Sequence, residues 1–76
     1  MKISEKLLSD VKKRIKELIR DNGRIDALSL KEDLRYNISG LPSYLEPYVE
    51  QARQELGIKQ VYEDAGTGRL KVFIKG

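Results

Sequence analysis

The sequence predicts a single mixed α+β domain over residues 1–76, in the order helix, strand, helix, helix and β-hairpin. Two periodicities carry this prediction. Apolar residues recur every three or four positions in two long segments, as on a helix, whereas near the end they alternate with polar residues, as on a strand. A chain of 76 residues has room for one small hydrophobic core. We therefore expect no second domain.

The first helix is expected over residues 5–21. Ser4 is a natural N-cap, and Asn22-Gly23 supplies a left-handed stop. Leu8 and Ile19 lie at the edge of the apolar stripe and could complete either the core or a dimer seam. The stripe consists of Leu7, Leu8, Val11, Ile15, Leu18 and Ile19.

Two short elements follow the first helix. Residues 24–27 alternate in polarity and predict an edge strand or an extended link. Ser29 followed by Glu32 has the pattern of a capping box, which predicts a helix over residues 30–36. Residues 37–42 contain Gly40 and Pro42 and predict a turn.

A third helix is expected over residues 43–56, and its start can be placed in two ways. Ser43 and Glu46 can cap it, or Pro47 can be its first helical residue, a position that suits proline. In either case Gly57 ends the helix. Its expected buried stripe is Leu45, Val49, Ala52 and Leu56, flanked by Tyr48.

The last segment, residues 58–75, predicts a β-hairpin around a glycine-rich turn at residues 64–68. Within it, two sets of residues alternate. We expect Leu70, Val72 and Ile74 to be buried. We expect Lys71, Phe73 and Lys75 to be exposed.

Composition excludes several classes of function. Without Cys or His, the chain has no disulfide, no cysteine zinc site and neither the commonest general base nor the commonest metal ligand. We therefore expect no enzyme, no metal and no cofactor. Apolar runs no longer than triplets predict no membrane span, and charge close to the N-terminus argues against a signal peptide, so a cytoplasmic protein is expected. Abundant Lys, Glu, Arg and Ile resemble the composition of thermophile proteins.

The order of elements resembles the winged helix-turn-helix superfamily: helix, strand, helix, helix, strand, wing, strand. The resemblance is carried by the helix and turn before residue 43, by the helix ending Glu55-Leu56-Gly57-Ile58 and by the hairpin around Gly66-Thr67-Gly68. It implies binding of double-stranded DNA, with the helix after the turn in the major groove and the wing on the backbone or minor groove. The superfamily also serves as a protein–protein scaffold.

The net charge of +3 is unevenly distributed. Residues 1–24 carry +4, residues 25–57 carry −3, and residues 58–76 carry +2. Affinity for DNA depends on Lys and Arg at the phosphates. The acidic middle third is therefore at odds with a helix that reads DNA.

Candidate DNA contacts lie on the hairpin and the third helix. Arg69 and Lys71 flank the glycine-rich turn, although Lys71 and Lys75 could equally protect an exposed strand from edge pairing. Gln51 and Gln54 could read adenine, or could simply lie on a solvated helix face. The further candidate contacts with DNA are Tyr44, Arg53 and Ser43. We expect a homodimer, because one small domain covers little DNA surface.

A basic row lies opposite the apolar stripe of the first helix. It consists of Lys6, Lys13, Lys16 and Arg20. The row could follow a phosphate backbone. Asp10 and Glu17 lie three or four positions from these cations, however, and such pairs are typical of an ordinary solvated face.

The alternative to DNA binding is a protein-binding adaptor or a subunit of a larger complex. An acidic third helix suits a basic protein partner better than it suits phosphate. The residues of this alternative interface are Glu46, Glu50, Tyr44 and Pro47.

Overall fold

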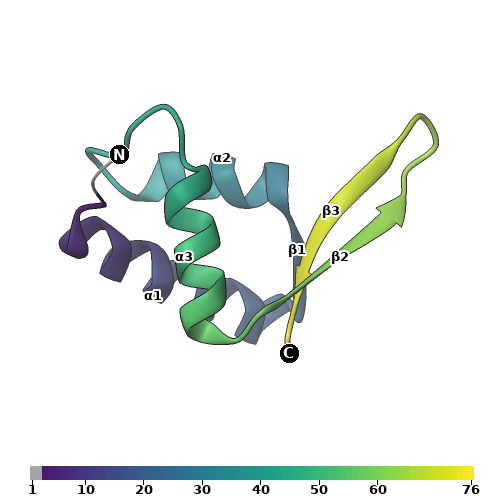
Figure 1. Cartoon of the computed structure of the whole chain (residues 1–76), viewed down its shortest axis with the longest axis horizontal. Helices are drawn as coiled ribbons and strands as arrows, with labels where there is room; N and C mark the ends of the chain where they lie inside the picture. Colours follow the sequence, from purple (N-terminus) through teal and green to yellow (C-terminus); the bar gives the residue numbers. More distant parts are fainter. Residues whose placement is uncertain (1–2) are drawn as a thin grey trace.

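The computed structural model describes residues 3–76, which form three helices and a three-stranded antiparallel sheet (Figure 1). The elements are α1 (Glu5–Asn22), β1 (Arg24–Asp26), α2 (Ala27–Asn37), α3 (Glu46–Leu56), β2 (Lys59–Asp64) and β3 (Arg69–Ile74). The mixed α+β class is thereby confirmed. The helices gather at one end of the molecule, and the β2–β3 hairpin extends beyond them.

The predicted start of α1 at Glu5 and its stop at Gly23 are confirmed, and the helix extends to Asn22, one residue beyond the predicted bound. The Ser4 hydroxyl oxygen accepts a hydrogen bond from the Leu7 amide at 3.4 Å, and Gly23 ends the helix with a φ of 77°. The Gly23 amide donates to the Ile19 carbonyl at 2.8 Å, which satisfies an orphan carbonyl of the last turn. Ile19 is buried in the core and Leu8 packs against that core, so both residues belong to the fold of one chain.

The predicted start of α2 is wrong. The helix begins at Ala27 rather than residue 30, and its N-cap is Asp26, whose Oδ2 accepts from the Ser29 amide at 2.9 Å. Because Asp26 receives that amide, Ser29 lies inside the first turn and is not the cap. Strand β1 accordingly stops at Asp26, one residue earlier than predicted.

The regular part of α3 begins at Glu46. The start at residue 43 is therefore wrong, and the alternative start at Pro47 is one residue late. Leu45 occupies the N-cap position without a side-chain cap, and Pro47 lies in the first turn, where its missing N–H costs little. Of the predicted stripe, Leu45, Val49 and Ala52 are buried, whereas Leu56 is half-buried. Gly57 ends the helix with a φ of 68°, as predicted.

The sheet has the spatial order β1-β3-β2, with β3 in the middle. Strand β2 pairs with β3 from Lys59↔Ile74 to Asp64↔Arg69, and β1 pairs with the other edge of β3. The predicted hairpin is therefore present, and its outer end lies farthest from the helices (Figure 1).

The predicted orientation of β3 is wrong in part. Phe73, expected to be exposed, is 2% exposed and belongs to the core shared with the helices. Val72 is also buried, because β3 is covered from both sides. On the face of Val72, the ion pair between Arg24 of β1 and Glu63 of β2 crosses the central strand. Lys71 lies two residues before Phe73 on β3 and therefore points to the same side of the sheet, the side that faces the helices.

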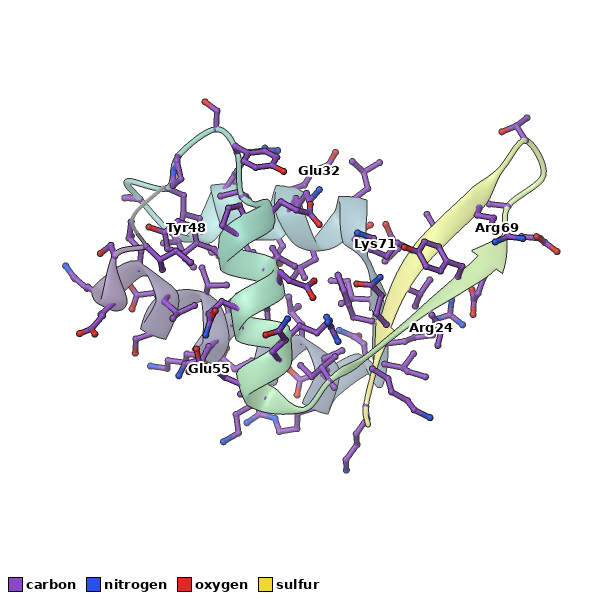
Figure 2. The ribbon with its side chains drawn as sticks, viewed as in Figure 1. Arg24, Glu32, Tyr48, Glu55, Arg69 and Lys71 are labelled. Atoms are coloured by element: carbon purple, nitrogen blue, oxygen red, sulfur yellow. The ribbon has the colours of Figure 1, made fainter. Side chains whose placement is uncertain are left out.

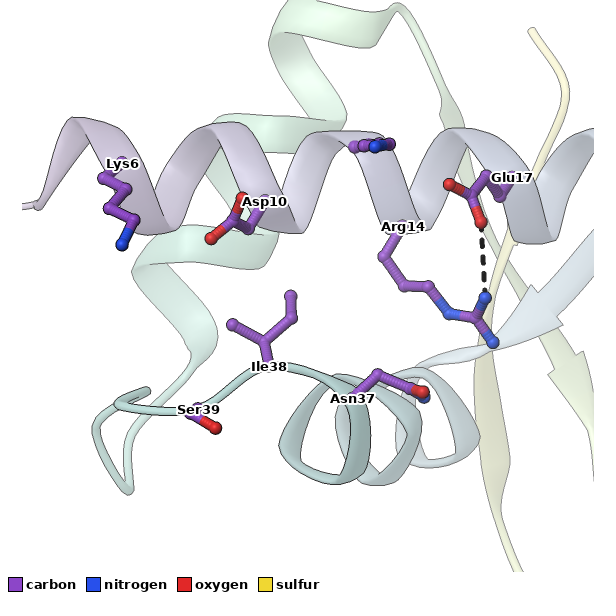
Figure 3. A pocket seen from close by; sticks show the side chains of 8 residues that line it. Lys6, Asp10, Arg14, Glu17, Asn37, Ile38 and Ser39 are labelled. Carbon is purple, nitrogen blue, oxygen red and sulfur yellow. Dashed lines mark hydrogen bonds and ion pairs between the residues drawn. The ribbon is translucent and has the colours of Figure 1, made fainter.

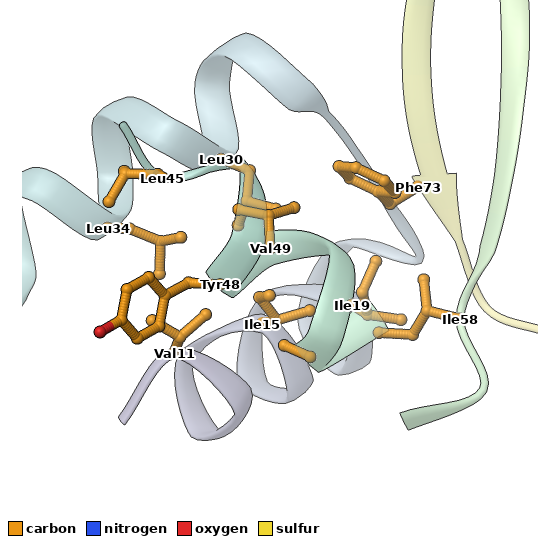
Figure 4. Close-up of a cluster of buried hydrophobic side chains, with 11 residues drawn as sticks. Val11, Ile15, Ile19, Leu30, Leu34, Leu45, Tyr48, Val49, Ile58 and Phe73 are labelled. Atoms are coloured by element: carbon orange, nitrogen blue, oxygen red, sulfur yellow. The ribbon is translucent and has the colours of Figure 1, made fainter. Parts of the chain in front are cut away.

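The core lies between the helices and the root of the hairpin (Figure 4). Its buried members are Val11, Ile15, Ile19, Leu30, Leu34, Leu45, Tyr48, Val49, Ala52, Ile58 and Phe73. Tyr48 also keeps a polar contact, because its hydroxyl oxygen accepts a hydrogen bond from the Ser4 amide at 2.9 Å. This bond links the start of α1 to α3. Within residues 3–76, we find no helix with the length and hydrophobicity needed to cross a membrane.

Candidate nucleic-acid interface

Arg69 lies at the outer end of the hairpin (Figure 2). It is the first residue of β3 and pairs in register with Asp64, the last residue of β2. Gly66 has a φ of 70°, a left-handed conformation suited to glycine, and the Ala65 amide donates to the Gly68 carbonyl at 2.8 Å. Arg69 is exposed and makes no ion pair within residues 3–76. Its guanidinium is available to a phosphate.

Lys71, in contrast, is engaged by the helices. Its Nζ lies 3.2 Å from Oε1 of Glu46, and Nζ of Lys31 lies 2.8 Å from the other carboxylate oxygen. The side chain of Lys71 is 28% exposed. The two ammonium groups, Lys31 first, lower the pKa of Glu46. Lys71 thus stabilises the contact between the sheet and α3 and is less available to an external ligand than Arg69.

Arg53 is also used inside the protein. Its guanidinium forms an ion pair with Glu50 one turn earlier, and Nη1 donates to the Ile58 carbonyl at 3.2 Å. The hydrogen bond from Arg53 lowers the pKa of Glu50 and raises that of Arg53. Arg53 therefore ties the end of α3 to the residue that precedes β2.

Gln51 and Gln54 lie on the exposed side of α3. Nε2 of Gln51 donates to Glu55 at 2.7 Å, and Nε2 of Gln54 donates to Glu50 at 3.2 Å. Glu55 also accepts from Lys12 of α1 at 3.0 Å, and these two donors, Gln51 first, lower its pKa. The amide oxygens of both glutamines remain on the surface and can take part in base recognition.

Ser43 and Tyr44 lie just before α3, in the segment that connects it to α2. Both are exposed, Tyr44 to 65%. The Ser43 carbonyl accepts from Nη2 of Arg35 at 2.7 Å, so a residue of α2 fixes the approach to α3. Pro47 in the first turn of α3 is half-buried.

One part of the predicted set is exposed in the structure. Ser43, Tyr44, Gln51 and Gln54 are exposed along α3 and its N-terminal approach, and Arg69 is exposed on the hairpin. Lys71 and Arg53 are drawn into ion pairs, as are Glu46 and Glu50 of the alternative interface.

The ion pairs of the three α3 carboxylates were not predicted from the sequence. Glu46 pairs with Lys31 and Lys71, Glu50 with Arg53, and Glu55 with Lys12. The Glu50–Arg53 spacing of three residues is a local signal that could have been found. The remaining pairs join residues 15 to 43 positions apart and depend on the fold.

Within residues 3–76, Lys6, Lys13 and Lys16 of the basic row of α1 make no ion pair, whereas Arg20 pairs with Asp21. Lys6 and Lys13 line a cleft of about 410 Å³ between α1 and residues 37–39, and Asp10 lines it with them (Figure 3). The expected pairing of Glu17 with the row is wrong, because Glu17 binds Arg14 at 3.4 Å. Arg14 also binds Asp33 of α2 through two bonds of 2.7 and 2.9 Å.

Residues 3–76 contain no group of three or more His, Cys, Asp or Glu side chains able to hold a metal ion. No protein-family model, curated protein or solved structure matches this chain. Its function is therefore inferred from the geometry of the described residues.

Proposed function

We propose that the protein is a small winged-helix DNA-binding protein, a transcription or replication accessory factor, with α3 as the helix facing the major groove and the β2–β3 hairpin as the wing. One observation supports this above the others. The carboxylates of α3 are neutralised by cations of the same chain, whereas Arg69 of the wing is exposed and unpaired within the described residues.

Neutralisation removes the main electrostatic objection to DNA binding. A helix with three free carboxylates would repel phosphates, but Glu46, Glu50 and Glu55 each lie within an ion pair. Gln51 and Gln54 are exposed on α3. Each Nε2 donates one N–H to a neighbouring carboxylate, which leaves its second N–H and the amide oxygen for an adenine edge. Arg69 supplies the cation that anchors the wing to the backbone.

The same ion pairs give less support to the alternative adaptor interface. A basic partner would have to displace Lys31 and Lys71 from Glu46, and Arg53 from Glu50, before it could pair with these carboxylates. Tyr44 remains exposed and can contact either kind of partner.

Fluorescence anisotropy with a labelled generic DNA duplex tests the proposal. We expect binding at low salt that weakens steeply as salt is raised, because phosphate contacts release counterions. Arg69→Ala should weaken binding about threefold to tenfold and reduce the salt slope by about one.

Lys59→Ala is the matched control. Lys59 is also exposed and also begins a strand of the hairpin, but it lies at the end of the hairpin remote from Arg69. It should change affinity less than Arg69→Ala. Absence of binding at low salt would disprove the proposed function, and equal effects of the two variants would show that the wing is not the contact.

A further inference from the structure

A second surface lies at the opposite end of the hairpin from Arg69. It is a groove of about 730 Å³ between the C-terminal half of α1, the α3–β2 connection and the end of the chain. Strand β3 separates it from the wing, since Ile74 is five residues from Arg69, or about 17 Å along a strand. In Figure 1 the hairpin turn and the C-terminus lie correspondingly far apart. A ligand in the groove would leave the α3–wing face free.

The floor of the groove is largely apolar. Ile19 of α1 and Ile58 line it from the core side, and Leu56 of α3 is half-buried and reachable from the groove. Gly76 forms a wall against Gly57, so close that a Cβ at Gly76 would lie 2.2 Å from the Gly57 carbonyl oxygen. The groove thus has a defined shape and offers contact to an apolar side chain.

The rim of the groove is basic. Its cations are Lys13, Lys16, Arg20 and Lys75. Arg20 pairs with its neighbour Asp21 at 3.1 Å, whereas the three lysines make no ion pair within residues 3–76. Glu17, the acidic side chain of the lining, is engaged by Arg14, and the α-carboxylate of Gly76 is a second negative group at the groove.

The ends of two helices reduce this positive charge without cancelling it. Gly23 and Gly57 follow the C-termini of α1 and α3 and both line the groove, and each helix end carries about half a negative charge. Two such ends balance about one of the three lysines, and the α-carboxylate of Gly76 balances a second. An excess of positive charge therefore remains around an apolar floor.

We propose that this groove binds an acidic segment of a partner protein that inserts an apolar side chain. Carboxylates of the segment would pair with the lysines of the rim, and its apolar residue would cover Leu56. A phosphate backbone would match the rim but would leave the apolar floor without a partner. The floor therefore favours protein over nucleic acid.

A titration of the ¹⁵N-labelled protein with a defined probe tests this proposal. The probe is a short synthetic peptide of glutamate residues around a central pair of leucines. We expect its addition to shift the amide signals of Ile19, Leu56 and Ile58. The doubly substituted variant Lys16→Glu/Lys75→Glu should lower the affinity at least about tenfold.

Two controls separate charge from apolar contact. Lys6→Glu makes a charge change of the same kind on α1 outside the groove and should change affinity less than about twofold. A peptide with serine in place of leucine should bind several-fold more weakly. Circular dichroism confirms that each variant is folded.

Three outcomes would overturn the proposal: no binding of the leucine peptide, equal binding of the serine peptide, or shifts of the groove signals by a DNA duplex and not by the peptide. The inference does not depend on DNA binding by the wing. Arg69→Ala should leave peptide affinity unchanged, so failure of one proposal can be distinguished from failure of the other.

Discussion

At the scale of single residues, the partners of a charged side chain decide what it can do. Lys71 and Arg69 lie two residues apart on β3 and share the helix-facing side of the sheet, yet Lys71 meets Glu46 whereas Arg69 lies beyond the helices, at the hairpin end. Two equally basic residues thus acquire different roles. Glu46 is the residue responsible, because it holds both Lys31 and Lys71.

The substitution Glu46→Gln tests this role. It removes the negative charge from two ion pairs whose side chains are each about 30% exposed, and should lower the free energy of unfolding by about 1 kcal/mol. Urea denaturation measures the change. Glu32→Gln, on the exposed side of α2 and without an ion pair in the part of the chain that the structure describes, should stay within about 0.5 kcal/mol of the parent. Equal effects of the two substitutions would mean that the Glu46 pairs contribute nothing.

At the scale of elements, caps determine where the helices begin and end. The glycine stops of α1 and α3 are local features, and both were predicted. The start of α2 was mispredicted because the predicted cap, Ser29, lies three residues after the observed cap, Asp26. The strand β1 holds Asp26 in an extended conformation, opposite Val72, and so decides between them.

The substitution Asp26→Ala should therefore destabilise the protein by about 1 kcal/mol, since it removes the acceptor of the Ser29 amide. Ser29→Ala should cost less than about 0.5 kcal/mol, because Ser29 lies within the first turn and is not its cap. Thermal unfolding followed by circular dichroism compares the two. A larger loss from Ser29→Ala would restore the capping box predicted from the sequence.

At the scale of the whole molecule, carboxylates that accept hydrogen bonds from other residues of the chain make the free energy of unfolding depend on pH. The pKa is lowered for Asp26, Asp33, Glu46, Glu50 and Glu55. The largest cause is the Ser29 amide for Asp26 and the Arg14 guanidinium for Asp33. A carboxylate with a lowered pKa in the folded state contributes stability above its ordinary pKa, 3.8 for Asp and 4.5 for Glu, and loses it as pH falls through the lowered value.

We therefore expect the free energy of unfolding to be nearly constant between neutral pH and about pH 5.5 and to fall below about pH 5. Urea denaturation at neutral pH and at about pH 3 measures this fall. The Glu46→Gln variant should lose less stability over the same interval than the parent, because one of the titrating groups is absent. A parent protein equally stable at both pH values would show that these ion pairs do not couple folding to pH.

For the candidate site, as for the fold, local sequence patterns predict one part and tertiary contacts decide the rest. Exposure of Gln51 and Gln54 follows from the apolar period of the third helix, so these two residues could be chosen from the sequence. Tyr44 is exposed as well but lies before the helix. The ion pair of Lys71 with Glu46 could not be predicted in this way, because the two residues lie 25 positions apart. The ion pair of Arg53 with Glu50 follows a local spacing of three residues and could have been found. The alternation of β3 is compatible with either face pointing inward. We predicted that the face of Val72 would meet the core, whereas Phe73 faces the helices.

The sequence by itself determined the mixed α+β class, both ends of α1, the end of α3 and the position of the hairpin, because each depends on residues close together in the chain. Only the tertiary structure decided which face of β3 meets the helices, which charges cancel and where an unpaired basic rim surrounds apolar residues. Those outcomes depend on contacts between elements far apart in sequence, such as Lys12 with Glu55 and Lys71 with Glu46. No local pattern specifies such contacts, since they form only when the core places the elements side by side.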